Sequence, residues 1–175
     1  MGFAAFFLNR TNRSGIMSGG VIGGKGQAGP WKLDARFRKS DLIGRIRRVA
    51  SYRSRIHLYE LDAATLLHDV VPTLPLRTLI YLDPPYYVKG RDLYDDHYQP
   101  SDHEKIARLT DQLSHPWIVS YDDVEPIRQI YSGRRMRSFD LNYSASRITS
   151  GHEVMIFQDG LNIPDDIRPT RSPLC

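Results

Sequence analysis

The feature that most restricts how this chain can fold is an apolar run, residues 77–82, that stops at two consecutive prolines. Its sequence, RTLIYL, has the length and composition of a buried strand. Pro84 and Pro85 have no backbone N–H to donate to a neighbouring strand, so the strand must end before them. Asp83 is therefore expected at the carboxyl end of a buried strand, which is the edge at which open α/β sheets bind their ligands.

Strand-like and helix-like segments alternate around this run. We expect a short strand near 56–60, a helix that starts after Asp62, and a further helix opened by a capping box of Ser101 and Glu104. The later segments predict a strand, a short helix and two paired strands, at residues 116–123, 124–131, 134–141 and 152–158. This order predicts an α/β fold with a mostly parallel sheet, helices on its faces and an antiparallel pair at the end.

The segment before this alternation has a different character. Residues 3–8, FAAFFL, look like the end of a helix or strand, so we expect the chain to start inside a domain. Residues 9–37 are polar, basic and rich in glycine, which predicts an irregular loop region with a hairpin. Residues 40–53 have apolar positions at helical spacing and predict an amphipathic helix with a basic outer side, capped by Ser40.

Positive charge is concentrated in residues 1–58. They carry twelve lysines and arginines against two aspartates, whereas the remaining residues carry twelve against eighteen acidic residues. The formal net charge of +4 hides this asymmetry. A basic half is typical of a phosphate-binding surface, although a solvated face with no ligand has the same composition.

Composition also restricts the class of protein. With 175 residues, of which 41% are hydrophobic, the chain can bury one core, so we expect a single globular domain. The one cysteine, Cys175, excludes a disulfide framework and fits a reducing, cytoplasmic setting. No apolar run approaches the roughly 18 to 20 residues of a membrane span, and the histidines are too scattered to suggest a metal site.

Residues 19–29, GGVIGGKGQAG, match two nucleotide-binding patterns at once. The phosphate-loop pattern requires Ser or Thr after Lys25, where this chain has Gly26. The dinucleotide pattern requires a helix after its last glycine, yet Pro30 follows Gly29. Because six of the eleven residues are glycine, both matches are expected to be accidental. A flexible backbone flanked by basic residues, Lys25 among them, suits a loop that faces nucleic acid.

The tetrapeptide Asp83–Tyr86, DPPY, has the residues needed to activate an exocyclic amine on a planar ring. A carboxylate and a backbone carbonyl that accept the two amine hydrogens would return the nitrogen lone pair for attack. Asp83 supplies the first acceptor and the Pro84 carbonyl the second, while Tyr86 offers a face for stacking, with Tyr87 beside it. The alternative is a proline turn that merely ends a strand.

These residues resemble the DNA adenine methylase family, which transfers a methyl group from S-adenosylmethionine. The resemblance covers most of the chain, through the segments FFLNRTNRSG, IHLYELDA, YLDPPYY, YDDHY and NYSASRITSGHEVMIF. It implies a Rossmann-like sheet, base flipping and methylation of the adenine N6 amine in double-stranded DNA. It further implies a catalytic domain over residues 1–163, with 9–38 as the DNA-recognition region and 164–175 as a flexible tail.

The resemblance also assigns individual residues. It implies that Asp83, Pro84, Pro85 and Tyr86 are the catalytic motif, with Asp83 also lying against the donor. Asp62 falls where the family contacts the adenosyl part of the donor, although by itself it would be interpreted as a helix cap. The segment LNRTNRSG matches the part that inserts into DNA, which adds to Lys25 the candidate DNA contacts Arg10, Asn12, Arg13 and Ser14.

One part of the family pattern is missing. Relatives with this order of motifs carry a glycine-rich donor loop, F-x-G-x-G, upstream of the recognition region, and this chain has none. We therefore expect either a truncated or split gene, or a donor site completed by a second polypeptide. Two alternatives stay open: a non-catalytic DNA-binding remnant, and a methyltransferase that acts on RNA adenine or a protein amide. A role in restriction and modification, in host protection or in a phage is equally open.

Overall fold

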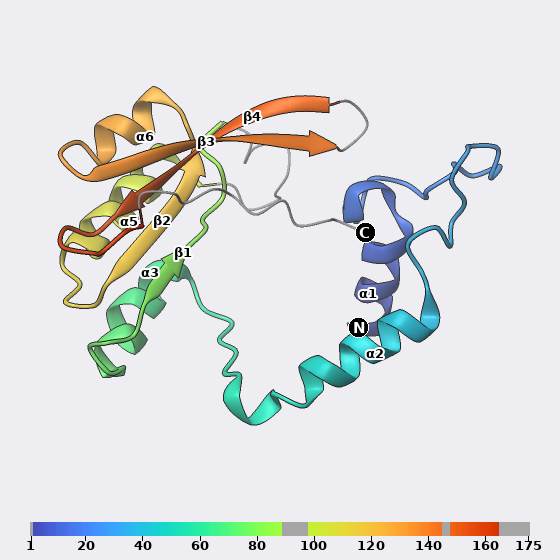
Figure 1. The fold of residues 1–175 in the computed structure, drawn as a ribbon, viewed down its shortest axis with the longest axis horizontal. Coiled ribbons are helices and arrows are strands. Elements are labelled where there is room, and N and C mark those ends of the chain that lie inside the picture. Colours follow the sequence, from blue (N-terminus) through green and yellow to red (C-terminus); the bar gives the residue numbers. More distant parts are fainter. Residues whose placement is uncertain (1, 89–97, 145–147, 165–175) are drawn as a thin grey trace. The chain divides into compact units, whose positions relative to one another are not determined.

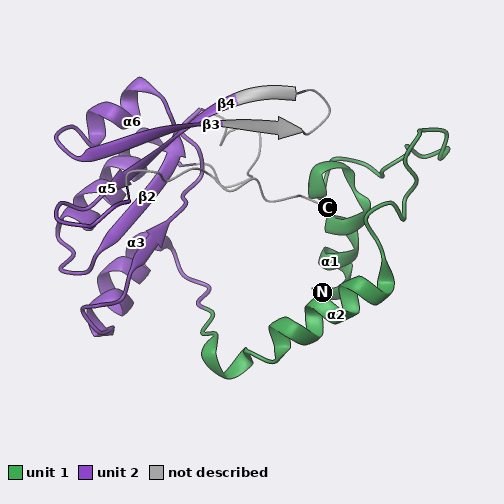
Figure 2. Cartoon of the chain, viewed as in Figure 1, with its two compact units in different colours: residues 1–58, 172–175 green, residues 59–171 purple. Residues whose placement is uncertain are grey.

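The computed structural model describes residues 2–88, 98–144 and 148–164, with only the backbone described at 141–144 and 148–150 (Figure 1). The chain divides into two compact units, Met1–Leu58 with Ser172–Cys175, and Tyr59–Arg171 (Figure 2). The predicted tail, 164–175, lies outside the described residues except for Pro164.

The second unit is built on a four-stranded sheet in the order β1-β2-β4-β3. Its strands are β1 (Ile80–Leu82), β2 (Trp117–Asp122), β3 (Arg135–Ser144) and β4 (Ile148–Phe157). Strands β1 and β2 are parallel, whereas β4 is antiparallel to both β2 and β3. The mixed α/β class and the terminal antiparallel pair are therefore confirmed, and the prediction of a mostly parallel sheet is wrong.

The missing parallel pairing has a local cause. Residues 56–60 form no strand and are exposed, so the expected first strand does not join the sheet. A parallel neighbour requires a crossover connection, and among the described strands only β1 and β2 are joined in this way, through α5 (Pro100–Asp111). The hairpin of β3 and β4 then adds to β2 through β4, which makes the remaining pairs antiparallel.

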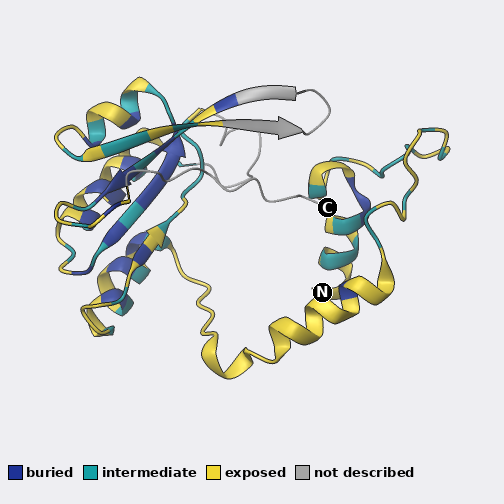
Figure 3. Cartoon of the chain, in the orientation of Figure 1, coloured by how far each residue is buried: buried dark blue, intermediate teal, exposed yellow. Residues whose placement is uncertain are grey.

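Helices pack against this sheet and close the core (Figure 3). They are α3 (Ala63–Thr65), which continues as a π-type turn (Leu66–Val70) and a 3-10 turn (Val71–Thr73), then α5 and α6 (Glu125–Ile130). Strand β2 is central: five of its six residues are buried, which is what an apolar strand covered on both faces requires. The largest fully buried side chains include Leu67, Trp117, Tyr121, Tyr131 and Ile156.

The start of α5 differs from the prediction by two residues. The capping box is formed by Gln99 and Asp102, not by Ser101 and Glu104. Pro100 explains the difference, because proline favours the first helical position and so makes Gln99 the cap. The predicted helix after Asp62 is confirmed, with Asp62 as its N-cap.

The first unit has two longer helices, α1 (Gly2–Thr11) and α2 (Lys39–Ala50), and short 3-10 turns at Arg13–Gly15 and Arg53–Arg55. The apolar run FAAFFL lies within α1, and the rings of Phe6 and Phe7 contact the ring of Phe37 at centroid distances of 6.4 and 5.4 Å. The predicted amphipathic helix is confirmed as α2. Its cap is Arg38 rather than Ser40, because the helix begins one residue before Ser40.

The glycine-rich segment between these helices folds as a series of turns, with one antiparallel bridge between Asn12 and Val21. Gly23 has φ +85, and a Cβ there would lie 2.6 Å from the Trp31 carbonyl oxygen, so only glycine fits. Within the described residues of this unit, no helix follows the glycine run before Lys39. Neither nucleotide-loop geometry is therefore formed.

Candidate active site at the carboxyl end of strand β1

Asp83 leaves the sheet directly after β1, and the parallel register places it next to Ser120 of β2. Leu82 pairs with Val119, so the following residues, Asp83 and Ser120, are neighbours. The Ser120 hydroxyl donates to Asp83 Oδ1 at 2.7 Å. Because the single hydroxyl hydrogen of Ser120 is donated to Asp83, the Tyr81 hydroxyl, 2.8 Å from Ser120 Oγ, is the donor to Ser120. A chain of hydroxyls from β1 and β2 thus orients the Asp83 carboxylate.

Asp83 remains open to a ligand in this arrangement. Asp83 is an exposed residue, whereas Ser120 is only 3% exposed. Within the described part of the chain no cation forms an ion pair with Asp83, and its second oxygen, Oδ2, has no hydrogen bond. One carboxylate oxygen is therefore held by the protein, and the other is available to accept a hydrogen bond from an N–H group of a ligand.

Asp122 holds the far end of the segment 83–88, which contains the two prolines. Its carboxylate is 6% exposed and accepts hydrogen bonds from the backbone N–H groups of Tyr87, at 2.7 Å, and Val88, at 3.0 Å. Ser120 and Asp122 are two residues apart on one strand, so their side chains point to the same face. This face of β2 consequently holds both ends of the segment 83–88.

The aromatic residue of the tetrapeptide is tied to β4. Tyr86 is half-buried, and its hydroxyl donates to Glu153 Oε1. Glu153 is the register partner of Asp122 in the antiparallel pair β2–β4, so both anchors of this loop come from one rung of the sheet. The Tyr86 ring is thereby restrained at its hydroxyl as well as through its backbone.

Tyr87, the next residue, packs against the core. Its ring lies 5.0 Å from the ring of His103. His103, on α5, is 1% exposed and its Nδ1 lies 3.1 Å from the Tyr121 hydroxyl. Burial lowers the pKa of His103 below its usual value, with Asp122 and Asp102 opposing the shift. The neutral imidazole therefore links α5 to β2 inside the core.

Asp62 acts as a helix cap. Its Oδ1 accepts hydrogen bonds from the N–H groups of Ala64, at 3.0 Å, and Thr65, at 3.3 Å. It also borders a hollow of about 140 Å³, shared with Tyr98, Asp102 and Lys105. Pockets that enclose a drug-sized ligand measure roughly 300–1,000 Å³. Among the described residues, the surroundings of Asp62 are therefore too small to hold the whole of S-adenosylmethionine, although Asp62 could contact part of it.

The predicted DNA contacts all lie in the first unit. Arg13, Ser14 and Lys25 are exposed, while Arg10 is half-buried and donates from Nε to the Arg36 carbonyl oxygen at 3.1 Å. Asn12 is different: it is 3% exposed, and its amide donates to the carbonyl oxygens of Ile16 and Met17. Its side chain holds the loop together, and a contact between Asn12 and DNA stays a prediction.

Ser120, Asp122 and Glu153 were not singled out from the sequence. The usable signal was the alternation S-Y-D within an otherwise apolar strand, because polar residues two positions apart share a face and must find partners when they are buried. Of the segment YDDHY at 94–98, which the family resemblance also used, only Tyr98 is described.

No protein-family model matches the chain, and no curated protein matches it. In the described residues there is no cluster of three or more His, Cys, Asp or Glu side chains that could bind a metal ion. Nor does any described helix have the length and hydropathy that crossing a bilayer requires.

Proposed function

We propose that this chain is an adenine-specific DNA methyltransferase, which uses S-adenosylmethionine to methylate the N6 amine of an adenine flipped out of duplex DNA. The observation that carries the proposal is the position of Asp83: an exposed carboxylate at the end of β1, held through one oxygen by buried Ser120 and followed by Pro84, Pro85 and Tyr86. The Rossmann-like character of the sheet is part of this proposal.

The chain's own residues account for binding and orientation of the amine. Asp83 Oδ2 accepts one N–H of the adenine amine and the Pro84 carbonyl accepts the other. Two acceptors on one nitrogen favour tetrahedral geometry and return the lone pair that ring conjugation removes. The Tyr86 ring, restrained by Glu153, provides the stacking surface for the extruded base. Most of the rate enhancement then comes from orientation.

The donor supplies an activated methyl group when it is bound. The hollow beside Asp62 is too small for the entire donor among the described residues, so we propose that a second polypeptide completes the donor site. In such an assembly Asp62 would face the adenosyl part, and Asp83 would lie against the donor while it accepts from the target amine.

The experiment is transfer of radiolabelled methyl groups to duplex DNA by the full chain, with Asp83→Ala compared with wild type. Asp69→Ala is the matched control, because its exposed carboxylate lies on the π-type turn, outside the site. We expect Asp83→Ala to lose at least 100-fold in rate, as removal of one preorganised group at a reacting centre does, and the control to retain full activity. Equal incorporation above background by all three proteins would refute the role of Asp83. No incorporation by any of them, wild type included, is the outcome expected if the donor site needs the second polypeptide.

A second function is favoured by the small hollow at Asp62: a DNA-binding module without catalysis, in which the basic first unit carries the binding. Saturable binding of S-adenosylmethionine by the isolated chain, measured by calorimetry, would contradict the non-catalytic alternative. Competition between duplex DNA and RNA across a range of salt concentrations tests whether DNA is the polymer.

A further inference from the structure

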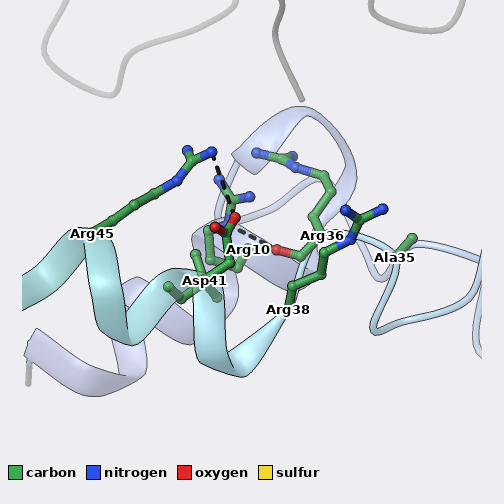
Figure 4. A pocket seen from close by; sticks show the side chains of 7 residues that line it. Arg10, Ala35, Arg36, Arg38, Asp41 and Arg45 are labelled. Carbon is green, nitrogen blue, oxygen red and sulfur yellow. Dashed lines mark hydrogen bonds and ion pairs between the residues drawn. The ribbon is translucent and has the colours of Figure 1, made fainter.

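A hollow of about 430 Å³ in the first unit is lined by four arginines, Arg10, Arg36, Arg38 and Arg45, together with Ala35, Asp41 and Leu42 (Figure 4). The side chains come from the end of α1, the loop before α2, and the first turns of α2. Buried Leu42 forms part of its apolar lining. The arrangement concentrates four guanidinium groups against a single carboxylate.

These charges are only partly compensated within the unit. Asp41 forms one ion pair, with Arg45, at a distance of 3.6 Å from Oδ2 to Nη2. Arg10 donates to a neutral acceptor, the Arg36 carbonyl oxygen, which leaves its charge unbalanced. Burial, and then the charges of Arg36 and Arg45, lower the pKa of Arg10, while Asp41 opposes them. An anion in the hollow would relieve this repulsion.

The backbone adds to the attraction for an anion. Arg38 is the N-cap of the twelve-residue helix α2, and this cap has no side-chain hydrogen bond to the first-turn N–H groups. Arg38 and Asp41, at the start of that helix, both line the hollow. The helix dipole and the first-turn N–H groups favour negative charge at this end. Guanidinium groups that approach from several sides match the tetrahedral array of phosphate oxygens.

We propose that this hollow is a binding site for one phosphate group. The phosphate belongs either to the phosphodiester backbone of DNA or to a small phosphate-bearing molecule, and the experiment below distinguishes these sources. The proposal goes beyond methyl transfer and does not depend on it, because binding is measured without any donor.

The test compares two double variants of the full chain that remove the same charge. Arg36→Gln/Arg45→Gln empties the hollow of two guanidinium groups, whereas Arg47→Gln/Arg53→Gln removes two exposed arginines that do not line it. Fluorescence anisotropy with a short duplex, repeated between 50 and 200 mM salt, reports DNA binding. Calorimetry with inorganic phosphate reports the second source. Far-UV circular dichroism establishes that both variants are folded.

We expect Arg36→Gln/Arg45→Gln to bind the phosphate ligand about tenfold more weakly than the control, Arg47→Gln/Arg53→Gln, as loss of a charge-assisted hydrogen bond predicts. If the phosphate is that of DNA, the slope of log affinity against log salt falls by about 1 more than in the control. If it is a free phosphate, only the calorimetric signal is lost. Equal effects of both variants on both ligands would overturn the proposal.

Asp41→Asn provides a test with the opposite sign. It removes the carboxylate that competes with phosphate and leaves every arginine in place, so phosphate affinity should increase severalfold. Unchanged or weaker binding by Asp41→Asn would contradict an anion site in this hollow.

Discussion

The segment 83–88 is held by Asp122, and replacing this residue tests that arrangement most directly. The carboxylate is 6% exposed and accepts two backbone hydrogen bonds, from Tyr87 and Val88. Hydrogen bonds to charged groups contribute about 1.5–3 kcal/mol each. Asp122→Ala loses both, which sums to about 3–6 kcal/mol. We expect its free energy of unfolding to fall by about 3 kcal/mol, the lower end of this summed range, because water can reach the partly buried N–H groups.

Asp122→Asn should lose about half as much. An amide offers one acceptor oxygen where the carboxylate offers two, so one of the two backbone N–H groups keeps its partner. For a unit of this size 1 kcal/mol corresponds to about 4 °C in Tm, which places the expected losses at about 12 °C for Ala and about 6 °C for Asn.

Thermal unfolding followed by circular dichroism measures these shifts, and amide hydrogen exchange localises them. Exchange of the Tyr87 and Val88 amides should accelerate in Asp122→Ala while the amides within β2 keep their protection. Asp140→Asn is the control, since its side chain, on β3 of the same sheet, is 82% exposed and should change stability by less than about 0.5 kcal/mol. Equal Tm values for Asp122→Ala and the control, or unchanged exchange at Tyr87 and Val88, would refute the anchoring role.

Three further predictions concern the same region. Ser120→Ala removes the hydrogen bond to Asp83 at nearly constant volume; in the proposed reaction kcat should fall about tenfold with KM for DNA unchanged, and an unaltered kcat would exclude a positioning role. Tyr86→Phe keeps the ring but loses the bond to Glu153, so it should retain more stacking on a flipped 2-aminopurine than Tyr86→Ala, as its fluorescence reports; identical signals would argue against stacking. The pKa of His103 is lowered in the folded protein, so the unfolded chain binds the proton more readily, and Tm should fall as pH decreases below about 6.5. The fall should be shallower in His103→Phe, and equal slopes would show that another group is responsible.

The end of β1 could be predicted from the sequence because it depends on local chemistry. A proline cannot continue the hydrogen-bonding pattern of a strand, so Pro84 alone predicts that β1 ends before it and that Asp83 lies at its carboxyl end. Its neighbours could not be found in this way. That Ser120 meets Asp83 depends on the register of two strands whose paired residues are 37 positions apart in the sequence, and register follows from the packing of the whole sheet.

The incorrect predictions have the same origin. Residues 56–60 have strand-like composition, yet Leu58 is 91% exposed and no strand forms, because a strand needs a partner as well as a pattern. The hydrogen bonds from the Asn12 amide to Ile16 and Met17 arise from turns that no local pattern indicates, so this role of Asn12 in its loop could not be predicted. Asp62 was correctly seen as a possible cap because its effect is confined to the next three residues.

The rung of the sheet that joins Asp122 to Glu153 has a consequence for assembly of the site. One residue of this pair restrains the backbone after the prolines and the other restrains the Tyr86 ring, and β4 is the last of the described strands. A nascent chain that has been synthesised only as far as β3 lacks Glu153, and a chain in which β4 docks one residue out of register presents the wrong side chains to the loop. The geometry around Asp83 therefore forms only after β4 has paired with β2 in the correct register, so an incompletely folded chain lacks the arrangement on which the proposed activity depends.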